Sequence, residues 1–325
     1  MSDVQKKHAV LITGASGYIG RETLHALAAI RARFARLVAL DVRPIPEAER
    51  SDGVEYVTQD IRDARLAQVL RTHDIDVVVH LASTVNMGPD VDPEFVRAVE
   101  VDGTQNVLDT CLSAGVQQVI VTSSGAAYGY YADNAQPLHE DDPIRGNEEF
   151  PYAHHKRLVE EMLARYRDEH PELRQLVLRP GTVLGASTDN LITNLFRKPV
   201  ILGVTGSPTP FVFIWDQDVV ACIVKGIVEQ RTGIYNLAGD GTMTMRAIAR
   251  RLGKPYVPLP AFVLQAALAI LRAIGVSQYG PEQVNFLRYR PVLANDRLKE
   301  DFGYTPEKTS VEVFEFYLES AQQRR

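Results

Sequence analysis

The chain has 325 residues, of which 45% are hydrophobic and 23% are charged, and its formal net charge is −6. This composition is typical of a globular protein with one large domain or a domain and a substantial lobe. The negative charge and the lack of a segment dense in lysine and arginine exclude a basic nucleic-acid-binding surface.

A glycine-rich turn follows the first predicted strand. After a polar N-terminus, which predicts no signal peptide and hence a cytoplasmic location, an apolar run leads into Gly14-x-x-Gly17-x-x-Gly20. Such glycines let the chain turn tightly, let backbone amides approach phosphates, and let the next helix pack closely with its N-terminus toward the anion. The turn therefore predicts a dinucleotide pyrophosphate site.

The second predicted strand ends in a carboxylate. Asp41 lies roughly 20 residues beyond the glycines, where an acid binds the ribose hydroxyls of adenosine. Because a carboxylate accepts hydrogen bonds from a 2′-hydroxyl and repels a 2′-phosphate, Asp41 favours NAD over NADP. Arg43 leaves NADP open, since an arginine nearby can pair with a 2′-phosphate. Asp41 is also compatible with an ordinary turn.

Two later segments carry groups suited to proton transfer. An apolar strand from Val119 ends in Ser123 and Ser124, at the edge where open α/β sheets bind ligands. Tyr152 and Lys156 are four residues apart at the start of a predicted helix and share one face. An ammonium near a phenol lowers the pKa of the phenol, as acid–base catalysis at neutral pH requires.

Strands and helices alternate up to about residue 181. The strands are expected near Val10, Val38, Tyr56, Val78, Val119 and Val177. This order predicts an α/β fold of the Rossmann type, a doubly wound parallel sheet with helices on both faces. After residue 181, short strands near Val212 and Tyr235 break the pattern. We expect an NAD-binding domain over 1–181 and a smaller C-terminal substrate lobe over 182–325, with some of its elements returning to the sheet.

The most apolar segment covers residues 261–274. It is too short to span a bilayer and is interrupted by Gln265 and Arg272. Three interpretations remain open, of which the first is favoured: a buried helix, a lid over an apolar substrate, or an interfacial membrane anchor. Cys111 and Cys222, far apart on predicted helices, have neither metal-ligand nor disulfide spacing and are expected to be reduced core thiols.

Taken in order, these motifs resemble the extended short-chain dehydrogenase/reductase family, also called the NAD-dependent epimerase/dehydratase family. The resemblance covers nearly the whole chain. Further matching segments are 60–63, 80–83, 101–108, 123–129, 178–181, 216–220 and 233–239. It implies that Tyr152 is the acid/base, that Lys156 holds the nicotinamide ribose, and that Ser124 orients the reacting oxygen.

The resemblance also implies which residues contact NAD. These are Gly14, Ser16, Gly17, Tyr18, Ile19, Gly20, Asp41, Asp60, Ile61, Leu81, Ala82, Ser83, Tyr152, Lys156 and Pro180. The candidate substrate contacts are Asn86, Met87, Ser124, Tyr128 and Trp215. No cluster of His, Cys and Asp has metal-ligand spacing, so no metal site is expected.

Three departures from the family pattern bear on function. Glu100 stands where the family usually has asparagine, and it is open to interpretation as a surface acid on a long helix. The stretch 207–210 lacks the arginine that binds diphosphate in members acting on nucleotide sugars, although Arg288 and Arg290 remain candidates. Gly125 and Ala126 occupy the positions of a dehydratase's acid pair, which argues against dehydration.

The leading hypothesis is an NAD-dependent oxidoreductase that transfers hydride at a secondary alcohol or ketone carbon. A nucleotide-sugar 4-epimerase would use the same residues and is an alternative. A non-catalytic NAD-binding sensor is a second alternative. We expect a small-molecule substrate, no nucleic-acid or membrane partner, and a homodimer formed by the helices around 96–112 and 152–166.

Overall fold

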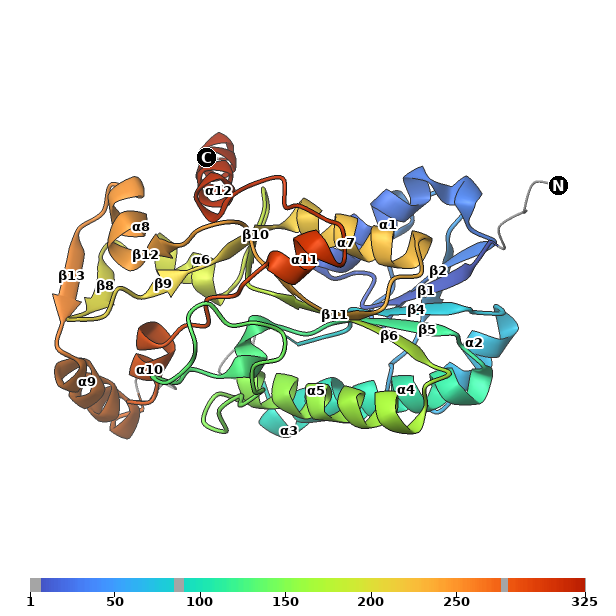
Figure 1. Cartoon of the computed structure of the whole chain (residues 1–325), viewed down its shortest axis with the longest axis horizontal. Coiled ribbons are helices and arrows are strands. Elements are labelled where there is room, and N and C mark those ends of the chain that lie inside the picture. The colour runs from blue at the N-terminus through green and yellow to red at the C-terminus, as the bar shows by residue number, and fades with distance from the viewer. Residues whose placement is uncertain (1–6, 85–90, 276–279, 325) are drawn as a thin grey trace.

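A seven-stranded parallel sheet forms the centre of the fold (Figure 1). The computed structural model describes residues 7–84, 91–275 and 280–324. The strands are β1 (Ala9–Thr13), β2 (Arg36–Asp41), β3 (Glu55–Thr58), β4 (Val77–His80), β5 (Gln118–Thr122), β6 (Arg174–Pro180) and β11 (Gly233–Leu237). Their order is β3-β2-β1-β4-β5-β6-β11, so the strand order reverses between β1 and β4. The predicted doubly wound α/β fold is confirmed.

Helices cover both faces of the sheet because its strands are apolar on both sides. One face packs against α1 (Tyr18–Ala29), α7 (Asp216–Val228) and α11 (Asp296–Glu300). The other packs against α2 (Leu66–Thr72), α4 (Gly103–Ala114) and α5 (Pro151–Glu169). Cys111 on α4 and Cys222 on α7 are buried free thiols in these two layers, as predicted.

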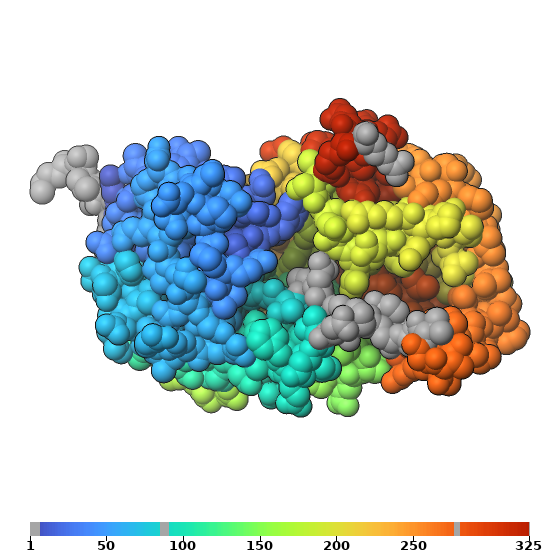
Figure 2. Space-filling model, turned by 180° about the vertical axis from the view of Figure 1, so that it is seen from behind, coloured from blue at the N-terminus to red at the C-terminus, as the bar shows by residue number. Residues whose placement is uncertain are grey.

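The rest of the chain between β6 and the C-terminus builds a lobe with its own aromatic core. Three small sheets pair β7 (Thr182–Leu184) with β10 (Phe213–Trp215), β9 (Pro210–Phe211) with β12 (Met243–Thr244), and β8 (Ile201–Val204) with β13 (Tyr256–Leu259). The lobe helices are α6 (Leu191–Arg197), α8 (Met245–Arg251), α9 (Ala261–Ala273), α10 (Gln283–Arg288) and α12 (Ser310–Gln323). Phe196, Phe211, Phe213 and Phe314 pack together in its core. In Figure 2 a hollow lies between the blue N-terminal part and the yellow segment of the lobe.

The apolar helix α9 is not buried, so the favoured interpretation of residues 261–274 was wrong. Leu264 is its single buried side chain, whereas Phe262 is 71% and Ile270 is 62% exposed. The helix lies at the end of the lobe beside α10 (Figure 1). The lid and the interfacial anchor stay predictions.

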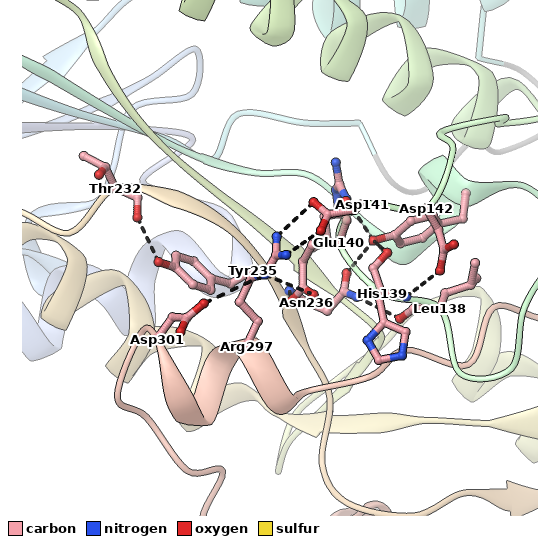
Figure 3. A network of polar contacts seen from close by, with 12 residues as sticks. Leu138, His139, Glu140, Asp141, Asp142, Thr232, Tyr235, Asn236, Arg297 and Asp301 are labelled. Carbon is pink, nitrogen blue, oxygen red and sulfur yellow. Dashed lines mark hydrogen bonds and ion pairs between the residues drawn. The ribbon is translucent and has the colours of Figure 1, made fainter.

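A buried polar network joins both parts of the chain at one end of β6. Arg179 donates to both carboxylate oxygens of Glu160 on α5, at 2.8 and 3.0 Å, and to the Glu140 carbonyl at 2.8 Å. The Glu140 carboxylate accepts from the Asn236 amide of β11 at 2.8 Å, and Arg297 binds the adjacent Asp141 (Figure 3). Since the Arg179 and Glu160 side chains are each only 3% exposed, their charges depend on each other for solvation.

Removal of the Glu160 carboxylate is expected to destabilise the protein strongly. Glu160→Ala leaves the buried Arg179 cation unpaired, which costs about 3–5 kcal/mol in the free energy of unfolding. Glu161→Ala is the matched control, because Glu161 is 58% exposed and makes a surface pair with Arg157; its effect should stay below about 1 kcal/mol. Equal losses in urea unfolding of the two variants would contradict this account of the network.

Candidate active site

The glycine turn lies where three segments of backbone meet. Gly14 adopts φ +68°, and a Cβ there would lie 2.5 Å from the Ala82 nitrogen, beyond the end of β4. A Cβ on Gly20 would overlap the carbonyl oxygen of Gly14. Any side chain at these positions would push α1 or β4 away from the turn. The geometry leaves the N-terminus of α1 open beside the carboxyl end of β1, as anion binding requires.

Asp41 is held at the other side of this turn. Its carboxylate is largely buried and accepts hydrogen bonds from the backbone amides of Ser16 at 2.9 Å and Arg43 at 3.0 Å. The exposed Arg43 guanidinium donates to the Ser16 hydroxyl at 3.0 Å. The acid end of β2 and the glycine turn are therefore one unit, as the motif spacing predicts.

Tyr18 connects this unit with the later part of the chain. Its hydroxyl donates to the carboxylate of Asp216 at the start of α7 and accepts from the Thr188 hydroxyl at 3.2 Å. Burial raises the pKa of the Tyr18 hydroxyl, with the neighbouring carboxylate adding to the effect. The phenol thus remains a donor that fixes α1 against α7.

A buried histidine lies between the turn and α4. The Thr104 hydroxyl donates to the Glu100 carbonyl at 2.6 Å, so His80 Nε2 must donate to Thr104 Oγ1 at 3.0 Å. His80 Nδ1 then accepts from the Thr13 hydroxyl at 2.8 Å. Burial and the positive charge of Lys156 lower the pKa of His80 to about 4. The imidazole is a neutral spacer in the core and offers no proton to a ligand.

Lys156 and Glu100 form a buried ion pair, which corrects the interpretation of Glu100 as a surface acid. The carboxylate is 2% exposed, and its Oε2 lies 3.1 Å from Lys156 Nζ. Its Oε1 accepts from the Ser83 hydroxyl at 2.6 Å and from the Thr84 amide. Glu100 lies in a π-helical turn, Ala98–Asp102, that joins α3 (Pro93–Arg97) to α4. Although burial opposes ionisation of both, their mutual attraction raises the pKa of Lys156 and lowers that of Glu100.

Tyr152 lies one helical turn before Lys156 in α5. The Lys156 Nζ atom is 5.5 Å from the centroid of the Tyr152 ring. The ring is half-buried and packs against Ala126, Tyr130 and Phe150. The predicted pair therefore shares one face of the helix.

Ser124 lies beyond β5 in extended backbone and caps the 3₁₀ turn Gly125–Tyr128. Its Oγ accepts from the Ala126 amide at 3.1 Å, so its hydroxyl proton remains available to a ligand oxygen. The rival Ser123 is buried, and its Oγ has no hydrogen-bond partner among the described residues.

Arg290 lies near this group, and no ion pair joins it to another described residue. Its guanidinium carbon is 4.2 Å from the centroid of the Phe211 ring and 4.7 Å from that of Phe286, and Nη2 donates to Thr182 at 3.1 Å. Part of the side chain is accessible, but Nη1 is not and has no hydrogen-bond partner within the described ranges. Burial lowers the pKa of Arg290 to about 10. Phe286 packs edge-on against Tyr130, at 5.0 Å between ring centroids, and so links Arg290 to the Tyr152 cluster.

Several other predicted site residues have partners of their own. Tyr128 is fully buried, and its hydroxyl hydrogen-bonds Asn236 and Arg179, which removes it from the candidate substrate contacts. Trp215 packs against Phe316 and Lys308. Asp60 makes a bidentate pair with Arg62. Asn86 and Met87 lie outside the described residues.

The remaining predicted cofactor contacts lie at the carboxyl side of the sheet. Ile19 is in the first turn of α1, Ile61 follows β3, Leu81 and Ser83 follow β4, and Pro180 ends β6. No group of three or more His, Cys, Asp and Glu in the described part of the chain is placed to hold a metal ion. Nor is any helix within those residues long and apolar enough to cross a membrane.

The sequence of the chain matches a family profile and related bacterial proteins. A sequence profile described as the NAD dependent epimerase/dehydratase family matches residues 10–238. A UDP-glucose 4-epimerase of Mycolicibacterium smegmatis is 30% identical over 336 residues, with 96% of this chain and 99% of that protein covered. An uncharacterized protein of Mycobacterium tuberculosis is 25% identical and covers 97% of this chain and 84% of its own length.

Solved structures share the fold at lower identity. The UDP-glucose 4-epimerase of Thermotoga maritima with UDP-glucose superposes with a TM-score of 0.73 at 18% identity, covering 97% of this chain and 99% of that one. A short-chain dehydrogenase/reductase superfamily protein from Agrobacterium tumefaciens with bound NAD superposes with a TM-score of 0.74 at 23% identity, covering 98% of both chains.

The buried His80 predicts a specific loss of stability in mild acid. Because its pKa falls from 6.5 to about 4 on folding, the unfolded chain binds more protons between these values, and stability declines as pH falls through that window. The contribution between pH 7 and pH 5 is about 2 kcal/mol. His80→Gln should remove it, and His170→Gln, at a partly exposed histidine beside Glu172, should not; urea unfolding at both pH values measures the difference. A wild-type pH dependence retained in His80→Gln would contradict the assignment.

Proposed function

Because the chain belongs to the NAD-dependent epimerase/dehydratase family, we propose that it is an NAD-dependent oxidoreductase acting on a secondary alcohol or ketone carbon of a nucleotide-linked sugar. The observation that carries the substrate class is the Arg290 guanidinium beside the Tyr152 cluster, which forms no ion pair within the described part of the chain. The similarity to a UDP-glucose 4-epimerase makes epimerisation the reaction that we propose.

The residues around the glycine turn fit NAD. Glycine at positions 14 and 20 allows α1 and the segment after β4 to pack closely against the turn, so that the start of α1 would face a bound pyrophosphate. Asp41 offers carboxylate oxygens for adenosine ribose hydroxyls. The negative charge of Asp41 disfavours the 2′-phosphate of NADP, even though Arg43 is close by. NAD, when bound, supplies the acceptor and donor of the hydride.

The protein's own groups then handle the proton and the oxygen. Tyr152 removes the hydroxyl proton from the reacting carbon's oxygen during oxidation and returns it during reduction. Ser124 donates a hydrogen bond to the same oxygen. Lys156 uses its remaining N–H donor for the nicotinamide ribose, since Glu100 and Ser83 take the other two.

Arg290 supports an anionic substrate in spite of the missing arginine at 207–210. Its guanidinium stacks on Phe211, the residue that directly follows this stretch, and the Ser207 hydroxyl donates to the Arg288 carbonyl at 3.2 Å. The C-terminal segment thus brings a cation to the place that the sequence pattern leaves without one. A diphosphate bound at the accessible part of the guanidinium would compensate its positive charge.

Further aspects of the proposal follow from the sequence and the family. Residues 125 and 126 carry no titratable group, which favours epimerisation over dehydration. Pairing of two copies through α4 and α5 stays a prediction. So does a cytoplasmic location.

Tyr152→Phe should abolish catalysis without abolishing cofactor binding. Loss of the acid/base group is expected to lower turnover of UDP-glucose by about 10²–10⁴-fold. The rise in melting temperature caused by NAD should persist. Tyr131→Phe is the control, because that ring packs under the Arg145 guanidinium. Unchanged turnover in Tyr152→Phe refutes the acid/base assignment, and absence of turnover in wild type with NAD bound favours the sensor alternative.

UDP should raise the melting temperature of the NAD-saturated protein, because a ligand bound only to the folded state stabilises it. Arg290→Met should lose most of this UDP shift and keep the NAD shift, with no loss of stability in the ligand-free protein. Arg272→Gln, at an exposed arginine paired with Glu282, should behave as wild type. If millimolar UDP leaves the wild-type melting temperature unchanged, the nucleotide part of the proposal is wrong, and apolar secondary alcohols become the substrates to screen.

A further inference from the structure

The carboxylate of Glu100 differs in charge from the asparagine amide that is usual in the family at this position. An amide can accept a hydrogen bond from the lysine but leaves its positive charge in place. In this chain a full negative charge lies 3.1 Å from Lys156 Nζ, with both side chains no more than 6% exposed. Water does not screen such a pair, so the two charges act on their surroundings together.

We infer that Glu100 is a positioning residue that holds the Lys156 ammonium in place and cancels most of its field at the Tyr152 hydroxyl. The inference rests on the proposed roles of Tyr152 and Lys156. Its consequence is that removal of the Glu100 charge exposes the Tyr152 phenol to the full field of the Lys156 ammonium.

Hydrogen bonds hold the Glu100 carboxylate in one orientation beside Lys156. Its two oxygens point to different partners: Oε2 to Lys156, and Oε1 to the Ser83 hydroxyl and the Thr84 amide. Lys156 also donates to Ser83 at 3.4 Å. The ammonium is therefore held from two directions, by the π-helical turn before α4 and by the segment after β4. It lies 5.5 Å from the centroid of the Tyr152 ring.

Arg290 beside the Tyr152 cluster, whose pKa burial lowers to about 10, is common to wild type and all variants, so its titration cancels in the comparison. The charged and titratable groups nearest the Glu100–Lys156 pair keep their charge from pH 7 up to the titration of the phenol. These are His80 on β4, His155 and Glu160 on α5, Arg97 on α3 and the neighbouring Tyr130. The pKa values of both histidines are lowered by burial, so they are neutral above pH 7. Glu160 is bound to Arg179, Arg97 is paired with Asp102, and burial raises the pKa of Tyr130 to about 12. Removal of the Glu100 charge is therefore the dominant electrostatic change in a Glu100 variant.

A direct titration of the phenol tests the inference without substrate or cofactor. The full chain is labelled with [ζ-¹³C]tyrosine, and the Tyr152 signal is identified by its loss in Tyr152→Phe. We expect the titration midpoint of this signal in Glu100→Gln and Glu100→Asn to fall by about one pH unit relative to wild type, a tenfold change in phenolate at a given pH. Glu161→Gln is the matched control, since Glu161 lies on the same helix as Tyr152 and Lys156 but is 58% exposed. Its midpoint should equal that of wild type.

A midpoint that is unchanged in folded Glu100→Gln overturns the inference and leaves Glu100 a purely structural residue, whose loss lowers only the melting temperature. If the lone ammonium prevents that variant from folding, the double variant Glu100→Gln with Lys156→Met removes both charges and keeps the interior neutral. Its Tyr152 midpoint should stay near the wild-type value, whereas a clearly higher midpoint shows that Lys156 acts on Tyr152 uncompensated and overturns the inference. UDP-glucose turnover in the same proteins tests the proposed function separately.

Discussion

Compensation of buried positive charge is the constraint on which both the fold and the site depend. Lys156 pairs with Glu100, and Arg179 pairs with Glu160. These two buried ion pairs fix α5 to the π-helical turn before α4 and to β6. Arg290 differs from these two cations. Aromatic rings and one hydroxyl surround it, and one of its nitrogens has no hydrogen-bond partner among the described residues. The paired cations position α5, and the unpaired one marks where a ligand's negative charge is expected.

Local patterns in the sequence predicted the parts of the site that depend on neighbouring residues. The glycine turn requires absent side chains at Gly14 and Gly20, and this requirement is visible as spacing alone. The Tyr152 and Lys156 spacing places both groups on one helical face, and Lys156 indeed lies over the Tyr152 ring. Alternating strands and helices likewise sufficed for the parallel sheet, since central strands such as β1 and β4 are buried on both sides.

Features that depend on distant residues were not visible in the sequence. Glu100 lies in a π-helical turn, which rotates the side chains that follow it relative to a regular helix, so periodicity gave no sign of its contact with Lys156. The ring that supports Arg290 belongs to Phe211, far away along the chain. Tyr128 was misjudged for the same reason, because its partners Arg179 and Asn236 come from β6 and β11. Two departures from the family pattern were the available signals for these contacts: the carboxylate at position 100 and the missing arginine at 207–210. Position 100 pairs with Lys156, and the residue after 207–210 supports Arg290.

The late position of β11 in the sequence means that the sheet is completed late during synthesis. β6 ends at Pro180, yet its neighbour in the sheet begins only at Gly233, after β7 to β10, α6 and α7. While the ribosome makes these intervening elements, β6 remains an open sheet edge, with unpaired amides that invite pairing with other chains. A fragment cut near residue 181 would keep that edge permanently. Residues 1–181 therefore lack the strand that covers the β6 edge in the complete fold, and this edge is closed only once β11 has been synthesised.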